Sequence, residues 1–459
     1  MKVINPASGE VVTEVHETAV KELPGILATA RQAQRAWAAR PLEERLAVIA
    51  RFRQLVSERR EELARTLTLE VGKPIAQSRN ELQGLLPRID FFLENVASEI
   101  EVRGVLGTKT EALEERIVFE PLGVIVNVSA WNYPYFVGSN VFVPAILTGN
   151  AVLYKPSELC CLTGQAIEKL LHDAGLPQGV FQTLVGGREL GAALVELPVD
   201  GVFFTGSYAT GRKIAAAVAP RMIRLQLELG GKDPAYIADD VDVPAVAAAV
   251  ADGAFYNTGQ SCCAVERIYV HERIYEPFLE AFVAEVKKLT LGDPNEEGTY
   301  IGPLCRGEVA IHELSEQVLD AEKQGGRVIL GGKRAARPGS FFEPTVVADA
   351  KPSMRVMRDE SFGPIIGIAS VASDEAALAA MADTDYGLTA AVYTTSEARA
   401  EKLLAELPVG SAYVNCCDRV SPRLPWTGRK HSGIGSTLSR LGIQAFVQPK
   451  AWHIRRSQS

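Results

Sequence analysis

The sequence has no excess of basic residues. Its 459 residues include 48 Lys and Arg against 56 Asp and Glu, which gives a formal net charge of -8 and a pI near 5.5. Binding to a phosphate backbone needs clustered Lys and Arg. The composition therefore argues against a nucleic acid as partner.

Cysteine is scarce and follows no disulfide or metal-binding pattern. Six of the seven cysteines form adjacent pairs, which are Cys160 with Cys161, Cys262 with Cys263, and Cys416 with Cys417. None of these spacings is CxxC, and an odd total suits a reducing compartment. We expect no metal site and a cytoplasmic protein, since the first residues, MKVINPASGE, also lack the basic region and apolar run of a signal peptide.

A long uncharged stretch, residues 121–154, is interrupted too often to cross a membrane. It contains Asn127, Ser129, Asn132, Pro134, Asn140 and Pro144. A lipid-facing helix does not tolerate so many polar and helix-breaking residues. We interpret the stretch as buried interior and expect a strand at GVIVNV, a loop at WNYP, a helix over 138–147 and a strand at AVLY.

The remaining composition is that of an ordinary globular protein, with 47% hydrophobic and 23% charged residues, and the length suits two or three compact units. Helical periodicity dominates residues 20–100. Residues 99–120 instead predict two strands around a polar turn. Such a hairpin is not stable alone and must pack against another part of the protein or another subunit.

Strands and helices alternate along the rest of the chain. Up to about residue 231 the candidate strands are GVIVNV, AVLYKP, FQTLVGG, GVFFTG and RLQLEL. From residue 234 a second set follows, with AYIAD, ERIYVHE, RVILGG, GPIIGIA, AAVYT and GSAYVN. Short connections and glycine-bearing turns predict an α/β fold with a Rossmann-like, doubly wound parallel sheet and a second α/β domain.

Two segments carry candidate reactive side chains. FYNTGQSCCA, residues 255–264, places Cys262 behind a Gly-Gln turn, where a thiol can be presented. LQLELGGK, residues 225–232, places Glu228 between apolar neighbours, where desolvation favours base chemistry near neutral pH. A single cysteine is more often a buried packing residue, so these segments need further support.

Four more motifs make the chain similar to the aldehyde dehydrogenase superfamily. They are AWNYP (130–134), LYKPSE (153–158), FTGSYATG (204–211) and ESFGP (360–364). The resemblance extends from INPASGE near the start to PWTGRKHSGIG near the end. It implies an NAD(P)-dependent, hydrolytic enzyme that does not acylate coenzyme A.

The resemblance assigns a catalytic role to three residues. Cys262 would attack the aldehyde, because the nucleophile stands two places after Gln260, and Cys263 would be a packing residue. The side-chain amide of Asn132 and the backbone NH of Cys262 would stabilise the oxyanion. Glu228 would activate the water that hydrolyses the thioester, and relatives that pass the acyl group to coenzyme A lack this glutamate.

The cofactor residues that the resemblance implies lie on several loops. FTGSYATG is not the GxGxxG fingerprint, and glycine turns of this kind are common, so only the resemblance makes it a pyrophosphate site. Glu158 would accept both ribose hydroxyls and repel a 2′-phosphate, so NAD is expected, with NADP possible. The full set is Trp131, Lys155, Ser157, Glu158, Gly206, Ser207, Gly211, Leu229, Glu360 and Phe362.

Aromatic residues dominate the substrate pocket that the resemblance implies, and they suit an apolar or aromatic aldehyde. Relatives that oxidise succinic semialdehyde often have Arg where Asn140 and Tyr256 stand here, which counts against a short acidic substrate. Arg419 or Arg423 could still pair with a carboxylate, so a semialdehyde dehydrogenase is the alternative. The expected pocket residues are Tyr133, Tyr135, Phe136, Tyr256, Trp426, Arg419 and Arg423.

The resemblance also implies a domain organisation. Residues 1–98 and 122–230, with 432–446 returning to them, would bind NAD, and 231–431 would form the catalytic domain. Residues 99–121 and 447–459 would form an oligomerisation arm in a homodimer or homotetramer whose small-molecule partner is an aldehyde. Two other readings stay open: a cysteine hydrolase that needs no cofactor, and a binding or structural protein that keeps only the fold.

Overall fold

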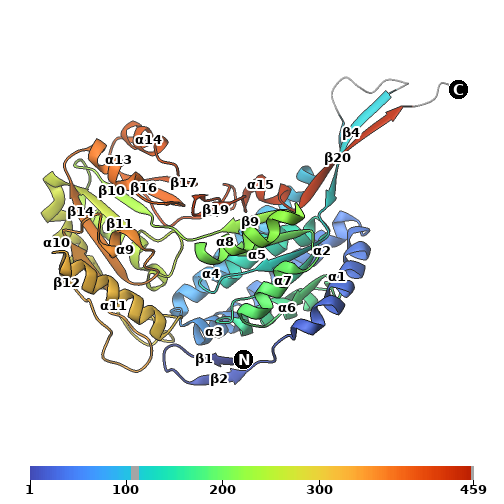
Figure 1. The fold of residues 1–459 in the computed structure, drawn as a ribbon, viewed down its shortest axis with the longest axis horizontal. Helices are drawn as coiled ribbons and strands as arrows, with labels where there is room; N and C mark the ends of the chain where they lie inside the picture. Colours follow the sequence, from blue (N-terminus) through green and yellow to red (C-terminus); the bar gives the residue numbers. More distant parts are fainter. Residues whose placement is uncertain (105–112, 456–459) are drawn as a thin grey trace.

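The computed structural model describes residues 1–104 and 113–455. Two sheets of mainly parallel strands, each covered by helices, form two lobes, and a narrow antiparallel sheet projects from one of them (Figure 1). This arrangement confirms the predicted α/β fold class. Within the described ranges, no helix combines the length and the apolar character that crossing a bilayer requires.

The first large sheet is doubly wound. Its six strands run in the order β19-β9-β8-β5-β6-β7, and all neighbours pair in parallel except β19 with β9. The chain changes direction across the sheet beside β5, and nucleotides bind at the carboxyl ends of strands at such a switch point. The strands are β5 (Val124–Val128), β6 (Ala151–Lys155), β7 (Phe181–Thr183), β8 (Gly201–Thr205), β9 (Arg224–Glu228) and β19 (Gly433–Ile434).

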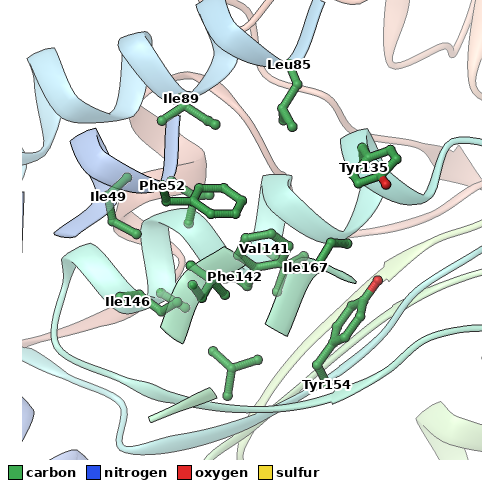
Figure 2. Close-up of a cluster of buried hydrophobic side chains, with 14 of the residues drawn as sticks. Ile49, Phe52, Leu85, Ile89, Tyr135, Val141, Phe142, Ile146, Tyr154 and Ile167 are labelled. Atoms are coloured by element: carbon green, nitrogen blue, oxygen red, sulfur yellow. The ribbon is translucent and has the colours of Figure 1, made fainter. Parts of the chain in front are cut away.

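Helices cover both faces of this sheet, which explains why its central strands are continuously apolar. Val124 and Val126 of β5 pack with α1, α7 and α8, while Ile125 faces the opposite cluster. Figure 2 shows part of that second cluster, in which Phe52 and Phe142 meet edge to face at 6.0 Å. The helices are α1 (Leu23–Ala38), α2 (Leu42–Glu58), α3 (Arg60–Val71), α4 (Ile75–Ile100), α5 (Pro134–Leu147), α6 (Cys161–Asp173), α7 (Arg188–Glu196) and α8 (Tyr208–Val218).

The second large sheet has seven strands in the order β12-β13-β14-β11-β10-β16-β17, parallel except for β12 with β13. Its strands are β10 (Pro234–Ile237), β11 (Arg267–His271), β12 (Arg327–Leu330), β13 (Thr345–Ala348), β14 (Ile365–Val371), β16 (Thr389–Tyr393) and β17 (Ser411–Val414). Of these seven strands, only β13 was not predicted from the sequence. The helices of this lobe are α9 (Val243–Phe255), α10 (Tyr275–Val286), α11 (Glu308–Lys323), α12 (Arg355–Arg358), α13 (Asp374–Ala382) and α14 (Glu397–Ala405).

The projecting sheet joins two distant segments of the chain. Strand β20 (Val447–Arg455) pairs with β4 (Leu113–Pro121) in antiparallel register from Val447 opposite Pro121 to Arg455 opposite Leu113, and β3 (Arg103–Gly104) adds to the other edge. The two long strands extend away from the body (Figure 1). Of the expected arm, residues 105–112 and 456–459 lie outside the described residues.

Smaller elements complete the fold. The hairpin of β1 and β2 lies at the N-terminus, β15 pairs with β18, and α15 leads into β20. Their bounds are β1 (Lys2–Ile4), β2 (Val11–Glu14), β15 (Tyr386–Gly387), β18 (Arg429–Lys430) and α15 (Ser439–Gln444).

Candidate active site

A cavity of about 1410 Å³ lies where loops from the two lobes meet. Pockets for drug-sized ligands have volumes of roughly 300 to 1,000 Å³, so this one has room for a dinucleotide and a small aldehyde together. Nine of the predicted site residues on these loops line it: Trp131, Asn132, Gly206, Ser207, Glu228, Leu229, Cys262, Glu360 and Phe362.

A left-handed turn presents Cys262 to this cavity. Asn257 and Thr258 have φ angles of 54° and 60°, and Gly259 follows at 70°. Left-handed backbone is rare for a β-branched residue, and it persists only where the surroundings fix it. Here Thr258 Oγ1 accepts the backbone NH of Gly302 at 2.9 Å, and a side chain on Gly259 would meet the carbonyl oxygen of Gly363 at 2.3 Å.

The two adjacent cysteines have different surroundings. Cys262 is half-buried, whereas Cys263 is buried and its Sγ donates to Asp418 Oδ1 at 3.0 Å. A hydrogen bond with Cys262 and then burial raise the pKa of Cys263 well above its usual value. Because a thiolate is the nucleophilic form, these surroundings disfavour Cys263 as the reactive group.

Asn132 lies against the nucleophile loop. The side-chain Nδ2 of Asn132 donates to the backbone carbonyl oxygen of Gln260 at 3.2 Å. The backbone carbonyl oxygen of Asn132 accepts a hydrogen bond from Asn257 Nδ2, also at 3.2 Å. Gln260 is held in turn by the backbone NH of Cys305, which donates to its Oε1 at 2.9 Å. The amide of Asn132 therefore lies in a fixed position next to the segment that carries Cys262.

Glu228 ends strand β9 and is buried beside the same cavity. Its Oε2 accepts Thr205 Oγ1 at 3.3 Å, and its Oε1 accepts both Gln226 Nε2 at 3.2 Å and the hydroxyl of Thr437. Burial raises the pKa of this carboxyl to about 7, against the effect of these hydrogen bonds. Such a group can gain and lose a proton near neutral pH.

The end of the cavity beside β8 has open backbone suited to phosphates. Gly206 and Ser207 lie at the start of α8, and Ser207 Oγ caps this helix by accepting the backbone NH of Thr210 at 3.4 Å. Helix N-termini with free backbone NH groups bind anions. A side chain at Gly206 would come within 2.6 Å of Phe204, so only glycine keeps this approach open.

Glu360 and Phe362 enter the cavity from the other lobe. Glu360 Oε1 accepts the backbone NH of Gly231 at 3.0 Å, and a Cβ on Gly230 would lie 2.3 Å from that same oxygen. Phe362 meets Trp131 edge to face at 5.5 Å. A carboxylate and two aromatic rings thus face the space between the lobes, which fits the polar ribose and flat ring of a nicotinamide nucleotide.

Comparison with known proteins identifies the family. The profile described as "Aldehyde dehydrogenase family" matches residues 1–452. This chain belongs to the aldehyde dehydrogenase family. The resemblance inferred from the motifs is thereby confirmed.

Individual relatives of this aldehyde dehydrogenase differ in substrate. "Succinate-semialdehyde dehydrogenase [NADP(+)]" of Deinococcus radiodurans is 34% identical over 448 residues, which cover 97% of this chain and 93% of the relative. "Betaine aldehyde dehydrogenase" of Cereibacter sphaeroides is 33% identical over 457 residues, 98% and 93% of the two chains.

The solved structures agree with the fold in detail. An NAD-dependent aldehyde dehydrogenase from Sinorhizobium meliloti superposes with a TM-score of 0.96 at 32% identity and covers 100% of this chain and 92% of its own. An NADP-dependent enzyme of E. coli gives 0.96 at 30% identity, with 99% and 94% covered. The structural relatives therefore include users of either cofactor.

The other predicted cofactor residues of this aldehyde dehydrogenase lie outside the cavity lining. Lys155 ends β6, and Ser157 and Glu158 follow it; Lys155 Nζ lies 3.7 Å from the exposed carboxylate of Glu158. Gly211 serves helix packing, because a side chain there would meet Leu229 at 2.6 Å.

Five of the predicted substrate residues line the cavity, namely Tyr133, Phe136, Tyr256, Trp426 and Arg419. The prediction for Tyr135 was wrong. Helix α5 begins at Pro134, so Tyr133, Phe136 and Asn140 share one face while Tyr135 points into the core, as Figure 2 shows. Its hydroxyl donates to the carbonyl oxygen of Leu63 at 3.4 Å.

The prediction for Arg423 was also wrong. The residue is exposed and does not line the cavity, although its neighbours Pro422 and Trp426 do. The turn after Ser421, whose Oγ accepts the backbone NH of Arg423 at 3.3 Å, directs the chain back to the surface there.

Several polar residues of the cavity were not predicted from the sequence, and two of the unpredicted residues bear directly on the site. Arg88 lines the cavity from helix α4, and Thr437 holds Glu228 from a segment near the C-terminus. The helical periodicity of residues 20–100 did not indicate that Arg88 faces the cavity and not the solvent. Thr437 lies two residues past the PWTGRKHSGIG motif, and no spacing rule connects it to Glu228.

Proposed function

We propose that this protein oxidises an aldehyde to a free carboxylic acid with NAD(P) as the hydride acceptor. The observation that carries the proposal is that Cys262, Asn132 and Glu228 line one cavity that has room for a dinucleotide. A thiol, an amide donor and a carboxyl with a pKa near 7 are the groups that the two halves of this reaction need.

In the first half of the reaction, Cys262 as thiolate attacks the aldehyde carbon, and a carbon–sulfur bond forms. The charge that develops on the carbonyl oxygen is stabilised by Asn132 Nδ2 and the backbone NH of Cys262. The hydrogen bond from Asn132 to Gln260 supports this role, because the donor is already oriented along the nucleophile loop. A nicotinamide held beside Glu360 and Phe362 would supply the hydride acceptor for this oxidation, which would leave the acyl carbon on Cys262 as a thioester.

In the second half, Glu228 takes a proton from water, and the water oxygen attacks the thioester carbon. The carbon–sulfur bond breaks, the acid is released, and Cys262 regains its thiolate or thiol form. The buried position of Glu228 supports this role, because burial raises its pKa to about 7 and makes it a competent base above that pH.

Residues of both lobes would hold the cofactor. Gly206 and Ser207 at the start of α8 suit the pyrophosphate, and Glu360 with Phe362 suits the nicotinamide ribose and ring. We assign the adenosine ribose to Lys155, Ser157 and Glu158, which lie at the carboxyl end of β6 next to the switch point. The negative charge of Glu158 favours NAD over NADP.

We also propose that the lobes and the arm have separate tasks. The six-stranded lobe binds the cofactor, the seven-stranded lobe supplies Cys262, and the sheet of β4 and β20 joins subunits in a homodimer or homotetramer. Trp452 on β20 is 42% exposed, which supports a role for this sheet in contact with another copy. Light scattering on the purified protein tests the oligomer.

The decisive experiment follows formation of reduced cofactor with NAD and NADP in parallel, for the wild type and Cys262→Ala. Hexanal, benzaldehyde and succinic semialdehyde serve as substrates. We expect turnover that disappears in Cys262→Ala. Ester hydrolysis without nicotinamide, and no reduced cofactor with any substrate, would instead indicate the cysteine hydrolase; inactivity in both assays would indicate a binding protein.

A further inference from the structure

One face of helix α4 is turned to the substrate end of the cavity. Asn80, Gly84, Pro87 and Arg88 all line it, at the spacing that places residues on one side of a helix. Arg88 is only 6% exposed, although Arg almost never lies so deep unless it is paired.

Arg88 forms one end of a stack of four side chains. Its guanidinium lies 3.9 Å from the ring centre of Phe136, Phe136 stacks on Tyr133 at 5.8 Å with an interplanar angle of 5°, and Lys73 Nζ lies 3.7 Å from Tyr133. A side chain on Gly84 would meet Phe136 at 2.9 Å, so this glycine makes room for the stack. Two buried cations therefore bracket one aromatic pair.

The two cations differ in their partners. Lys73 forms a buried ion pair with Glu81. Arg88 has instead a neutral partner, Asn140, whose Oδ1 accepts Nη1 at 3.0 Å. Within residues 1–104 and 113–455, no carboxylate oxygen lies within 4.0 Å of its guanidinium.

The buried charge of Arg88 is consequently undercompensated. Desolvation lowers the pKa of its guanidinium to about 10, although Glu81 opposes this shift. Arg267 is also buried, but its guanidinium donates hydrogen bonds to the backbone carbonyls of Lys232 and of residues 380–383 and to the hydroxyl of Tyr269. Among the described residues, Arg88 makes only the hydrogen bond to Asn140, and its side chain lines the cavity.

We propose that Arg88 is the substrate anchor of this enzyme and binds a carboxylate at the far end of the aldehyde, so that the substrate class is the carboxy-terminated semialdehydes. The inference rests on the proposed function, since it concerns the substrate of that reaction. A guanidinium held flat against Phe136 and fixed by Asn140 presents the planar fork that carboxylates bind.

Other arginines also line the cavity, and three of them are already in ion pairs: Arg306 with Glu313, Arg355 with Asp359, and Arg358 with Asp383. Arg419 is exposed at the surface, where solvent weakens an ion pair. Asp418 accepts hydrogen bonds from Ser261 and Cys263, and Asp252 accepts one from the hydroxyl of Tyr300. Arg88 thus replaces Arg419 and Arg423 as the residue for the carboxylate, and it reverses the expectation of an apolar substrate.

The test compares aldehydes that differ only in the terminal carboxylate, which are succinic semialdehyde with butanal and glutaric semialdehyde with pentanal. For the wild type we expect kcat/KM to favour the semialdehyde of at least one pair by about 10²-fold or more. In Arg88→Met, which retains an apolar stem against Phe136, that preference falls by a similar factor, and Arg88→Lys recovers part of it. Arg45→Met is the control, because Arg45 is also buried but donates to the backbone carbonyls of Ala38 and Arg40 and does not line the cavity. This variant should keep the wild-type preference.

A binding experiment without turnover completes the test. Calorimetry measures succinate and butyrate binding to Cys262→Ala and to Cys262→Ala with Arg88→Met, and only the former is expected to prefer succinate. The role of Arg88 is overturned if the wild type has equal kcat/KM for butanal and succinic semialdehyde. It is also overturned if Arg88→Met lowers kcat/KM for the two aldehydes by the same factor. In either case the aldehyde dehydrogenase reaction itself stands. No reduced cofactor from any aldehyde, with Arg88-dependent succinate binding still present, refutes the proposed function instead.

Discussion

Thr437 donates the hydroxyl hydrogen bond that holds Oε1 of Glu228, although the two residues lie 209 positions apart in the chain. Strand β19 brings them together, because Gly433 and Ile434 pair with Glu228 and Leu227 at the edge of the first sheet. The orientation and acidity of the proposed base therefore depend on the C-terminal segment.

Replacement of Thr437 by Val should raise the pKa of Glu228 above its value of about 7, since the hydrogen bond from Thr437 lowers it. The base acts when deprotonated, so the acidic limb of the kcat profile should move to higher pH. Activity then falls at pH 7 and recovers at higher pH. Thr437→Ser keeps the donor and serves as the control; an unmoved or lowered limb would contradict the prediction.

Replacement of Asn132 by Ala should lower kcat by about 10²- to 10³-fold, because the oxyanion loses its side-chain donor. Asn132→Asp keeps the shape without the amide, so it should lose a similar factor. Both are measured by steady-state formation of reduced cofactor, with circular dichroism as the check on folding. Activity of either variant within tenfold of wild type would remove Asn132 from the mechanism.

Replacement of Glu158 by Gln should increase the use of NADP relative to NAD. The change removes a negative charge that would repel the 2′-phosphate of NADP at the proposed ribose site. If the repulsion falls by about 1.4 kcal/mol, the ratio of kcat/KM for NADP to that for NAD rises tenfold. Glu196→Gln removes an exposed acid at the end of α7 and should leave the ratio as it is. An unchanged ratio in Glu158→Gln would place the ribose elsewhere.

Replacement of Lys73 by Met should destabilise the protein by about 3 to 5 kcal/mol, because the carboxylate of Glu81 remains buried without its partner. The midpoint of thermal unfolding reports the loss. The double variant Lys73→Met with Glu81→Gln removes the unpaired carboxylate and keeps a side-chain oxygen to accept the backbone NH of Tyr135. It should therefore recover much of the loss in the thermal unfolding midpoint. Failure to recover would mean that Lys73 stabilises the fold through Tyr133 alone.

The sequence was informative wherever local pattern decides structure. Apolar runs such as GVIVNV and AVLY became β5 and β6, and the strand expected at GVFFTG became β8. The helix after WNYP was expected to begin at residue 138 and begins at Pro134. That shift of one turn decided which aromatic residues face the cavity and sent Tyr135 into the core.

Residues whose roles depend on distant partners could not be predicted. Arg88 lies in an amphipathic helix, where an arginine is usually solvent-exposed, and only packing on Phe136 and Asn140 shows that it points inward. Strand β13 was missed because four residues after a proline carry too little periodicity to stand out. Thr437 has no link to Glu228 before the chain is folded.

Both the β4–β20 sheet and the proposed base Glu228 are completed by residues that are synthesised late. Strand β4 leaves the ribosome long before its partner β20, since Lys450 and its ion-pair partner Glu120 lie 330 positions apart. Until then β4 presents an open edge, and such edges promote aggregation of nascent chains. Thr437 and β20 both follow the second large sheet in the chain, so closure of that edge and completion of the proposed hydrolytic centre coincide during synthesis. A chain truncated before them would be both inactive and prone to aggregate.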